Sequence, residues 1–316
     1  MKHSLSSREI AETATFAAIS AIVIKIVPGI PIVGVSGAAL NFNAALAPVY
    51  GLIIGPYLGF LAALVGGVVT AGSPFDLLTS FAPAVSALIA GLLTQKGIRN
   101  DESRIKGWMF ASAILSLLIL GWYLTDIGQK APFYPVLHFA GLALMILTRN
   151  KIVPVFKEGR SAGSSWTVKP HFYLAGITTL VLAFIFIMPY LSSIGIFSVL
   201  AFPLFLAGGI MIVYGLFGIG KSAFALAVSI ASYCGVITDH MLGNLVFISS
   251  INIFIPLTTV NDFFLKPLGL PDVPSLFMYM IPVSTVERLM FTLVATILGV
   301  GLVLAIRRAN LLTRRS

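Results

Sequence analysis

Residues 41–72, NFNAALAPVYGLIIGPYLGFLAALVGGVVTAG, decide the fold because they form a long apolar run that is broken in its middle by Pro56. A proline inside a helix removes a backbone donor and clashes with the preceding turn, so one continuous helix is disfavoured. The run predicts two short helices joined by a tight turn at Gly55-Pro56. Each helix would be about 22 Å long, which is short for a hydrocarbon core of about 30 Å.

Small residues recur at every fourth position of this predicted hairpin. They are Gly51, Gly55, Gly59, Ala63, Gly67 and Ala71. This spacing allows helix backbones to approach closely in lipid. The turn itself carries no charge, so we expect it to present an apolar patch to the cytoplasm or to a partner protein.

The composition of the whole chain is that of a polytopic membrane protein. Of its 316 residues, 58% are hydrophobic and 10% are charged, and the mean hydropathy is +1.01. Soluble globular chains average about 25% charged residues. The single cysteine, Cys234, lies in an apolar run, which excludes a disulfide framework and a thiolate metal cluster. The net charge of +9 does not indicate nucleic acid binding, because the basic residues cluster in short loops between apolar runs.

Apolar windows predict an all-α fold of about ten membrane spans. The expected limits are 10–27, 42–55, 57–72, 78–95, 107–125, 132–148, 172–191, 195–219, 222–244 and 286–306. With the N-terminus inside, most of the 20 basic residues fall in cytoplasmic segments, which predicts that both termini lie in the cytoplasm. We interpret residues 10–27 as a retained first span and not as a cleaved signal peptide.

Two segments required a choice between span and loop. Residues 245–258 are apolar, but an eleventh span would place the basic C-terminus outside, so we expect an extension of the ninth span or a re-entrant outer loop. Residues 150–170 are rich in Gly, Ser and Lys and are expected to form a cytoplasmic loop.

Residues 215–222, GLFGIGKS, satisfy the phosphate-binding pattern G-x-x-x-x-G-K-[ST]. That site requires a preceding strand and an aqueous α/β domain, whereas a predicted membrane span precedes this segment. We therefore interpret it as a cytoplasmic turn. Because no paired catalytic groups stand out elsewhere, we expect no enzymatic activity, no cofactor and no metal site.

The first predicted span carries two overlapping pairs of small residues. They are Ala14 with Ala18, and Ala17 with Ala21. Such pairs either pack against another helix of the same chain or receive a partner helix. Lys25, near the outer end of this span, either snorkels to the interface or pairs with an acid or a substrate carboxylate.

Polar residues gather at the predicted outer side of the membrane. Tyr233, His240 and Asn244 share one face of the ninth span because they are seven and four residues apart. The remaining candidates lie at the outer ends of other spans or beside this face, and they are Asn41, Asn43, Asp76, Asp239 and Glu287. A few polar groups between apolar walls are typical of a ligand site, although each of them could also cap a helix or lie among headgroups.

Three features together resemble the substrate-binding S components of energy-coupling factor (ECF) transporters. The alanine pairs of the first span are similar to the AxxxA signature of that family, and LAPVYGLIIGPYLGFLAALVGG resembles its short second and third helices. The segments GVITDHMLGNLVF and STVERLMFTLVATILGVGLVLAIRR resemble its fifth and sixth helices. The resemblance implies a six-helix core interrupted by four extra spans. Accordingly, we expect core helices in residues 1–104, inserted helices in residues 105–221, and the last two core helices in residues 222–316.

The resemblance also implies a function without catalysis. The subunit would bind a vitamin or vitamin precursor from outside, and it would reorient when a transmembrane coupling subunit and two ATPases act on it. We expect the protein in a prokaryotic cell membrane. From the polar groups at the outer side, we expect the substrate contacts to be Asn41, Asn43, Asp76, Tyr233, Asp239, His240, Asn244 and Glu287. The resemblance makes the alanine face of the first span the docking surface, and together with the uncharged turn the expected docking residues are Ala14, Ala17, Ala18, Ala21, Gly55 and Pro56. The inserted helices either widen the substrate pocket, bind another subunit or only pack around the six-helix core.

A second hypothesis is a self-sufficient, ion-coupled secondary transporter of ten spans. That class predicts an internal repeat with broken helices at matching positions in both halves. The Gly55-Pro56 break has no clear counterpart in the second half of the chain, which counts against this hypothesis.

Overall fold

The computed structural model describes residues 6–27, 30–31, 39–40, 42–95, 106–158 and 223–308. Within these residues the chain is helical apart from a two-residue antiparallel strand pair, β1 (Ile30–Pro31) and β2 (Ala39–Leu40). The longer helices are α1 (Ser7–Ile26), α2 (Asn43–Ile54), α3 (Pro56–Thr70), α5 (Phe81–Thr94), α6 (Gly107–Tyr123), α8 (Val136–Leu147), α12 (Ala223–Ser250) and α15 (Val273–Arg308). The shorter ones are α4 (Pro74–Thr79), α7 (Asp126–Lys130), α9 (Ile152–Glu158), α13 (Leu257–Val260), the π-helix η2 (Asn261–Leu265) and α14 (Lys266–Leu268).

Three helical stretches are long and apolar enough to cross a membrane: Pro74–Thr94, Ala223–Ser250 and Val273–Arg307. Four shorter apolar helices, α2, α3, α6 and α8, accompany them. The helical, membrane-protein character of the prediction is therefore confirmed. Eight of the ten expected spans coincide with described helices, and the spans expected at 172–191 and 195–219 lie outside the described residues, as does the GLFGIGKS turn.

Two expected boundaries differ from the structure. α15 begins at Val273, earlier than the expected start at 286, and it continues through Pro282. The sequence did not indicate this first part because Pro274 and Pro282 look like breaks, whereas helices in a bundle tolerate a proline where neighbours compensate the freed backbone group. In addition, α9 forms within the segment that was expected to be a loop.

The apolar segment at 245–258 divides between two elements. Its first part extends α12 to Ser250, which agrees with the expected extension of the ninth span. The chain then turns at Ile251–Ile255, where Asn252 adopts a φ of 66°, and continues into α13.

The predicted hairpin of α2 and α3 is present, and its turn lies at Gly55, which has a φ of 91° that glycine adopts readily. A Cβ at Gly51 would lie 1.9 Å from the Ala87 carbonyl oxygen of α5, and one at Gly91 would lie 2.6 Å from Pro56 Cα. The small residues thus bring α2 and α3 against α5. Gly55 and Pro56 are buried, so this turn is not the bare patch that the sequence suggested.

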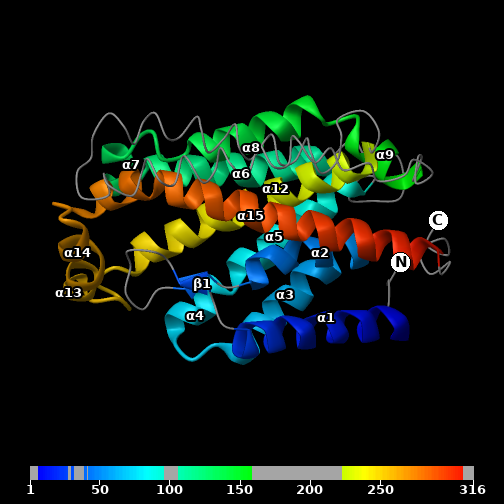
Figure 1. The fold of residues 1–316 in the computed structure, drawn as a ribbon, viewed down its shortest axis with the longest axis horizontal. Coiled ribbons are helices and arrows are strands. Elements are labelled where there is room, and N and C mark those ends of the chain that lie inside the picture. Colours follow the sequence, from blue (N-terminus) through cyan, green and yellow to red (C-terminus); the bar gives the residue numbers. More distant parts are fainter. Residues whose placement is uncertain are drawn as a thin grey trace, which may run out of the picture.

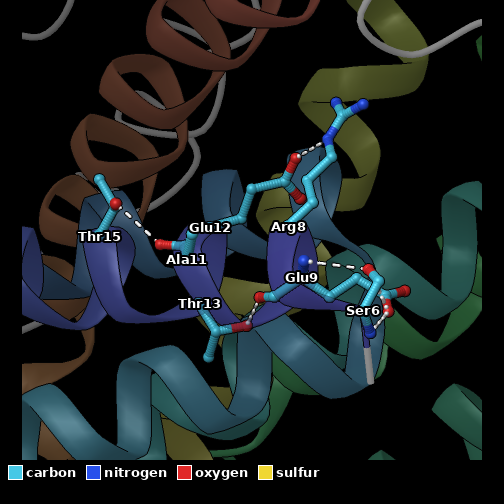
Figure 2. Close-up of polar contacts among 7 residues, drawn as sticks. All are labelled: Ser6, Arg8, Glu9, Ala11, Glu12, Thr13 and Thr15. Carbon is cyan, nitrogen blue, oxygen red and sulfur yellow. Dashed lines mark hydrogen bonds and ion pairs between the residues drawn. The ribbon is translucent and has the colours of Figure 1, made fainter. Parts of the chain in front are cut away.

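α1 is stabilised at its start by a capping box (Figure 2). The Glu9 backbone N–H donates to Ser6 Oγ at 3.2 Å, and the Ser6 N–H donates to Glu9 Oε2 at 2.9 Å. An ion pair between Arg8 and Glu12 at 2.7 Å follows on the next turn. The capping box satisfies two backbone N–H groups at the start of α1 that have no carbonyl partner within the helix.

The long helices lie side by side (Figure 1). α1 lies at one edge against α3, α2 and α5 lie further in, α12 and α15 follow, and α6 and α8 lie on the opposite side. The start of α1 and the end of α15 lie at the same end of the bundle, while α7, α13 and α14 lie at the other end (Figure 1). The latter is the end that the charge pattern assigns to the outside.

Candidate functional site

α12 is the helix on which the candidate site is built, because it packs against α5, α8 and α15. Glycines make two of these contacts close. A Cβ at Gly235 would lie 2.7 Å from the Ser86 carbonyl oxygen of α5, and one at Gly141 of α8 would lie 2.7 Å from Ile237 Cγ2. These close approaches hold α12 tightly against α5 and α8.

Tyr134, in the turn before α8, joins two of the predicted site residues. Its hydroxyl lies 3.1 Å from His240 Nε2 and accepts a hydrogen bond from Asn244 Nδ2 at 2.9 Å. Ser284 of α15 lies near this hydroxyl. One phenol therefore joins the α8 side of the bundle to α12 and lies close to α15.

Aromatic rings surround this phenol. Trp122 stacks on Tyr134 with centroids 4.8 Å apart, and Phe277 meets the edge of both rings at 4.9 Å. On the other side, His138 of α8 stacks on His240 with centroids 5.3 Å apart and an interplanar angle of 19°. Stacked and edge-to-face rings of this kind fix one another's orientation.

Three charged residues complete the cluster. Glu287 and Arg288, neighbours on α15, form an ion pair, and the Arg288 guanidinium lies 5.4 Å above the Phe291 ring. The Asp239 carboxyl lies close enough to both members of that pair to interact with them electrostatically. Arg288 also lies close enough to His138 and His240 for an electrostatic interaction. Asp239, His240 and Glu287 are 6%, 8% and 7% exposed, so these groups are removed from solvent.

Several buried atoms of this cluster have no hydrogen-bond partner among the described residues. They are both ring nitrogens of His138, His240 Nδ1, Asp239 Oδ2 and Arg288 Nε. Ionisable groups within membrane-spanning segments are costly and commonly mark substrate or ion pathways. We refer to Tyr134, His138, Asp239, His240, Asn244, Glu287 and Arg288 as the polar cluster.

The other predicted substrate residues lie elsewhere. Asn43 is buried and its Oδ1 accepts a hydrogen bond from Ser20 at 2.9 Å, which links α2 to α1. Asp76 is exposed and accepts from the Gly72 N–H near the start of α4. Tyr233 flanks the polar cluster and donates to the Leu137 carbonyl oxygen at 3.0 Å. Asn41 lies outside the described residues.

Sequence reasoning did not select Tyr134, His138, Ser284 or Arg288 for the site. His138 carried a usable signal, since an imidazole within an apolar span is unusual. Tyr134 and Ser284 carried none, because neither side chain is unusual at the end of a span. Within the described chain, no group of three or more His, Cys, Asp and Glu residues is arranged to hold a metal ion.

A cavity of about 470 Å³ opens at the end of the bundle that carries α7 and α13. Its polar lining consists of Asp126, Lys130, Asn252, Asn261 and Asp272. Hydrogen bonds from the hydroxyl and the backbone N–H of Ser275 lower the pKa of Asp272. Ile248 and Val273, which belong to α12 and α15, also line it, so this cavity lies over the ends of two helices that form the polar cluster.

The alanines of α1 divide between two faces. Ala14 and Ala18 are exposed, whereas Ala17 is buried and Ala21 is half-buried. A Cβ at Gly66 of α3 would lie 2.8 Å from the Ala17 carbonyl oxygen, so the Ala17 side of α1 packs within the chain. The Ala14/Ala18 pair is left free of the described helices, and Lys25 is exposed as well.

Comparison with known proteins bears on the identity of this bundle. Residues 4–142 match the protein family described as "ECF-type riboflavin transporter, S component". An uncharacterized protein of Methanocaldococcus jannaschii is 28% identical over 122 residues, which are 37% of this chain and 38% of that relative, so the chain spans well under two thirds of its length. No solved structure matches. The family match confirms the predicted resemblance: over residues 4–142 the chain is similar to the substrate-binding S components of ECF transporters.

Proposed function

We propose that this protein is the substrate-specific membrane subunit of an ECF-type ABC importer. It binds a vitamin or vitamin precursor from the outer side and reorients in the membrane to deliver it. A transmembrane coupling subunit and two ATPases supply the energy, so the chain itself is no enzyme. The observation that carries the proposal is the family match over residues 4–142, which contain α1, the α2–α3 hairpin, Tyr134 and His138.

The substrate site of this proposal is the polar cluster. It offers hydrogen-bonding groups beside aromatic faces, which is the lining that orients a heteroaromatic ligand. The cavity above α12 and α15 provides an entrance from the outer end. Because the description of the matched family names riboflavin, riboflavin is the first ligand to test.

The packing also supports a role for the predicted insert. α6 and α8 lie within residues 105–221, and both pack against α12. Since Tyr134 and His138 also come from this segment, we propose that the insert widens the substrate site. The division of the chain at 104 and 221 stays a prediction.

The docking surface of the proposal is the exposed side of α1 around Ala14 and Ala18. Small residues there allow a partner helix to approach the α1 backbone. The buried Gly55-Pro56 turn would contribute by holding α2 and α3 against α5, and not by direct contact.

One observation favours a second candidate, the ion-coupled secondary transporter. Carboxyl and imidazole groups buried together within spans are also found in proton relays. The two candidates differ in their source of energy, which gives a direct test.

The test is purification of the tagged full-length chain from native membranes, followed by identification of its partners by mass spectrometry. The proposal predicts recovery of a transmembrane coupling protein together with two ATPase subunits. Recovery of the chain alone, combined with uptake of riboflavin into vesicles under an ion gradient, would favour the second candidate and exclude the first.

A further inference from the structure

We infer that the polar cluster binds a ligand carrying a positive charge, such as a cationic heteroaromatic compound. This inference rests on the proposed function, because it assigns the chemical class of the ligand that the subunit carries. It goes beyond the family description, since riboflavin is neutral near pH 7.

The polar cluster contains more acidic than permanently basic side chains. Among the described residues, Asp239 and Glu287 supply two carboxyl groups, whereas Arg288 supplies one fixed positive charge. Arg288 pairs with Glu287, which leaves the Asp239 carboxyl without a contacting basic group in the described part of the chain. An uncompensated charge is costly in a membrane interior. Neutrality is restored either by a proton or by a cation, and a ligand cation can take the place of the proton.

Three aromatic rings pack together at Tyr134 of the polar cluster. Trp122, Tyr134 and Phe277 lie in mutual contact at centroid distances of 4.8 to 4.9 Å. The faces of such rings attract cations, most strongly for tryptophan, and desolvation strengthens the attraction. Tyr134 contacts His240, which follows Asp239 on α12, so the rings and the uncompensated carboxyl belong to the same part of the bundle. Aromatic rings together with a carboxyl group are a combination that recognises a positively charged ring system. A neutral ligand would use the rings but would leave the carboxyl uncompensated.

The polar cluster also contains buried polar atoms that make no hydrogen bond to any residue that the structure describes. Asp239 Oδ2, His240 Nδ1 and both nitrogens of His138 are buried and without hydrogen-bond partners among the described residues. A bound ligand that donates to Oδ2 and exchanges hydrogen bonds with an imidazole would satisfy them. Buried polar groups without a partner destabilise a protein, so their persistence points to a ligand that contacts them.

The test compares probes that differ in charge. Thermal unfolding of the purified full-length chain is measured with 1-methylnicotinamide against nicotinamide, which differ by one methyl group and one positive charge. Thiamin, a larger cation, and riboflavin, which is neutral, are measured beside this pair. The inference predicts that at least one cationic probe raises the unfolding temperature and that its neutral counterpart does so less. Ligand binding to the folded state stabilises by mass action, so the dependence on concentration yields the Kd.

Asp239→Asn is the decisive variant, because it keeps the shape of the side chain and removes its charge. We expect it to raise the Kd of the cationic probe at least about tenfold, since a charged group that loses its buried partner binds much more weakly. The unliganded variant should unfold at the same temperature as the wild type or higher, because a buried charge has been removed. Asp262→Asn is the matched control, since Asp262 is an exposed carboxyl that pairs with Lys266 at the surface and belongs neither to the polar cluster nor to the lining of the cavity. It should leave the Kd unchanged.

Two results would overturn the inference. Stabilisation by riboflavin alone, with the same Kd in Asp239→Asn, would show that the carboxyl does not recognise the ligand. Stabilisation by no cation of the panel would likewise contradict it. Neither result concerns the coupling protein and the ATPases, so recovery of those partners would leave the proposed function standing while this inference fails.

Discussion

At the scale of single residues, Tyr134 is the side chain on which the polar cluster depends. Its hydroxyl contacts His240 and Asn244 of α12, and its ring packs against Trp122 and Phe277. The turn that precedes α8 is thereby tied to the centre of the bundle. Loss of the hydroxyl would leave polar groups of α12 buried and unpaired.

Tyr134→Phe should accordingly lower the free energy of unfolding by about 1–3 kcal/mol, which is the cost of leaving a buried hydrogen-bonding group unsatisfied. The measurement is the unfolding midpoint in a denaturing detergent titration. Tyr123→Phe is the matched control, because its hydroxyl donates to the Pro132 carbonyl oxygen at an exposed position. Equal losses of unfolding free energy in the two variants would mean that the Tyr134 hydroxyl stabilises the protein no more than an exposed hydroxyl does.

The sequence predicted part of this cluster at the residue scale. The seven- and four-residue spacing placed His240 and Asn244 on one face of the ninth span, and the structure brings both to Tyr134. Tyr134 itself was not predictable, because no pattern within one helix tells which residue of another helix lies opposite. Asn43 and Asp76 were chosen as polar residues at helix ends, and they serve helix contact and capping.

At the scale of elements, the hairpin of α2 and α3 organises the first half of the bundle. Proline at the first turn of α3 and glycine at the end of α2 separate the two helices at the position that the sequence predicted. The start of α15 was not predicted, because a proline tolerated within a helix looks in the sequence like a break. Packing partners decide such cases, and they are not visible in a single sequence.

Gly51→Ala tests the close contact of this hairpin with α5. The added Cβ would lie 1.9 Å from the Ala87 carbonyl oxygen, so the backbones must separate, and we expect a loss of about 1–3 kcal/mol in the free energy of unfolding. Gly243→Ala on α12 is the control, since nothing lies within 4 Å of its Cβ position. Alanine should there stabilise the helix by about 0.5–1 kcal/mol. A neutral result for Gly51→Ala would contradict the tight α2–α5 contact.

At the scale of the whole molecule, the positions of α1 and α8 matter most. The two helices lie on opposite sides of the bundle (Figure 1). α1 exposes Ala14 and Ala18 on one side, while α8 and the turn before it contribute His138 and Tyr134 to the polar cluster. Docking of a partner and binding of a ligand would thus use different parts of the molecule, as expected for a subunit that is moved by others.

Ala17→Leu separates packing within the chain from docking. Ala17 is 8% exposed and lies on the side of α1 that packs against α3, so a leucine should overpack that contact and cost about 1–3 kcal/mol. The measurement is again the unfolding midpoint, compared with Ala18→Leu. The exposed Ala18 position should tolerate leucine, and an equal loss there would mean that this side of α1 is also covered.

The central claim is that a separate energy-supplying module docks on the Ala14/Ala18 side of α1, and one measurement tests it most directly. The amount of ATPase subunit recovered with the tagged chain is compared between the wild type, the double variant Ala14→Leu/Ala18→Leu, and Ala140→Leu, which makes the same exchange at an exposed position on α8. The account predicts that the double variant loses the ATPases while it still folds, and that Ala140→Leu retains them. Undiminished recovery with the double variant would contradict it.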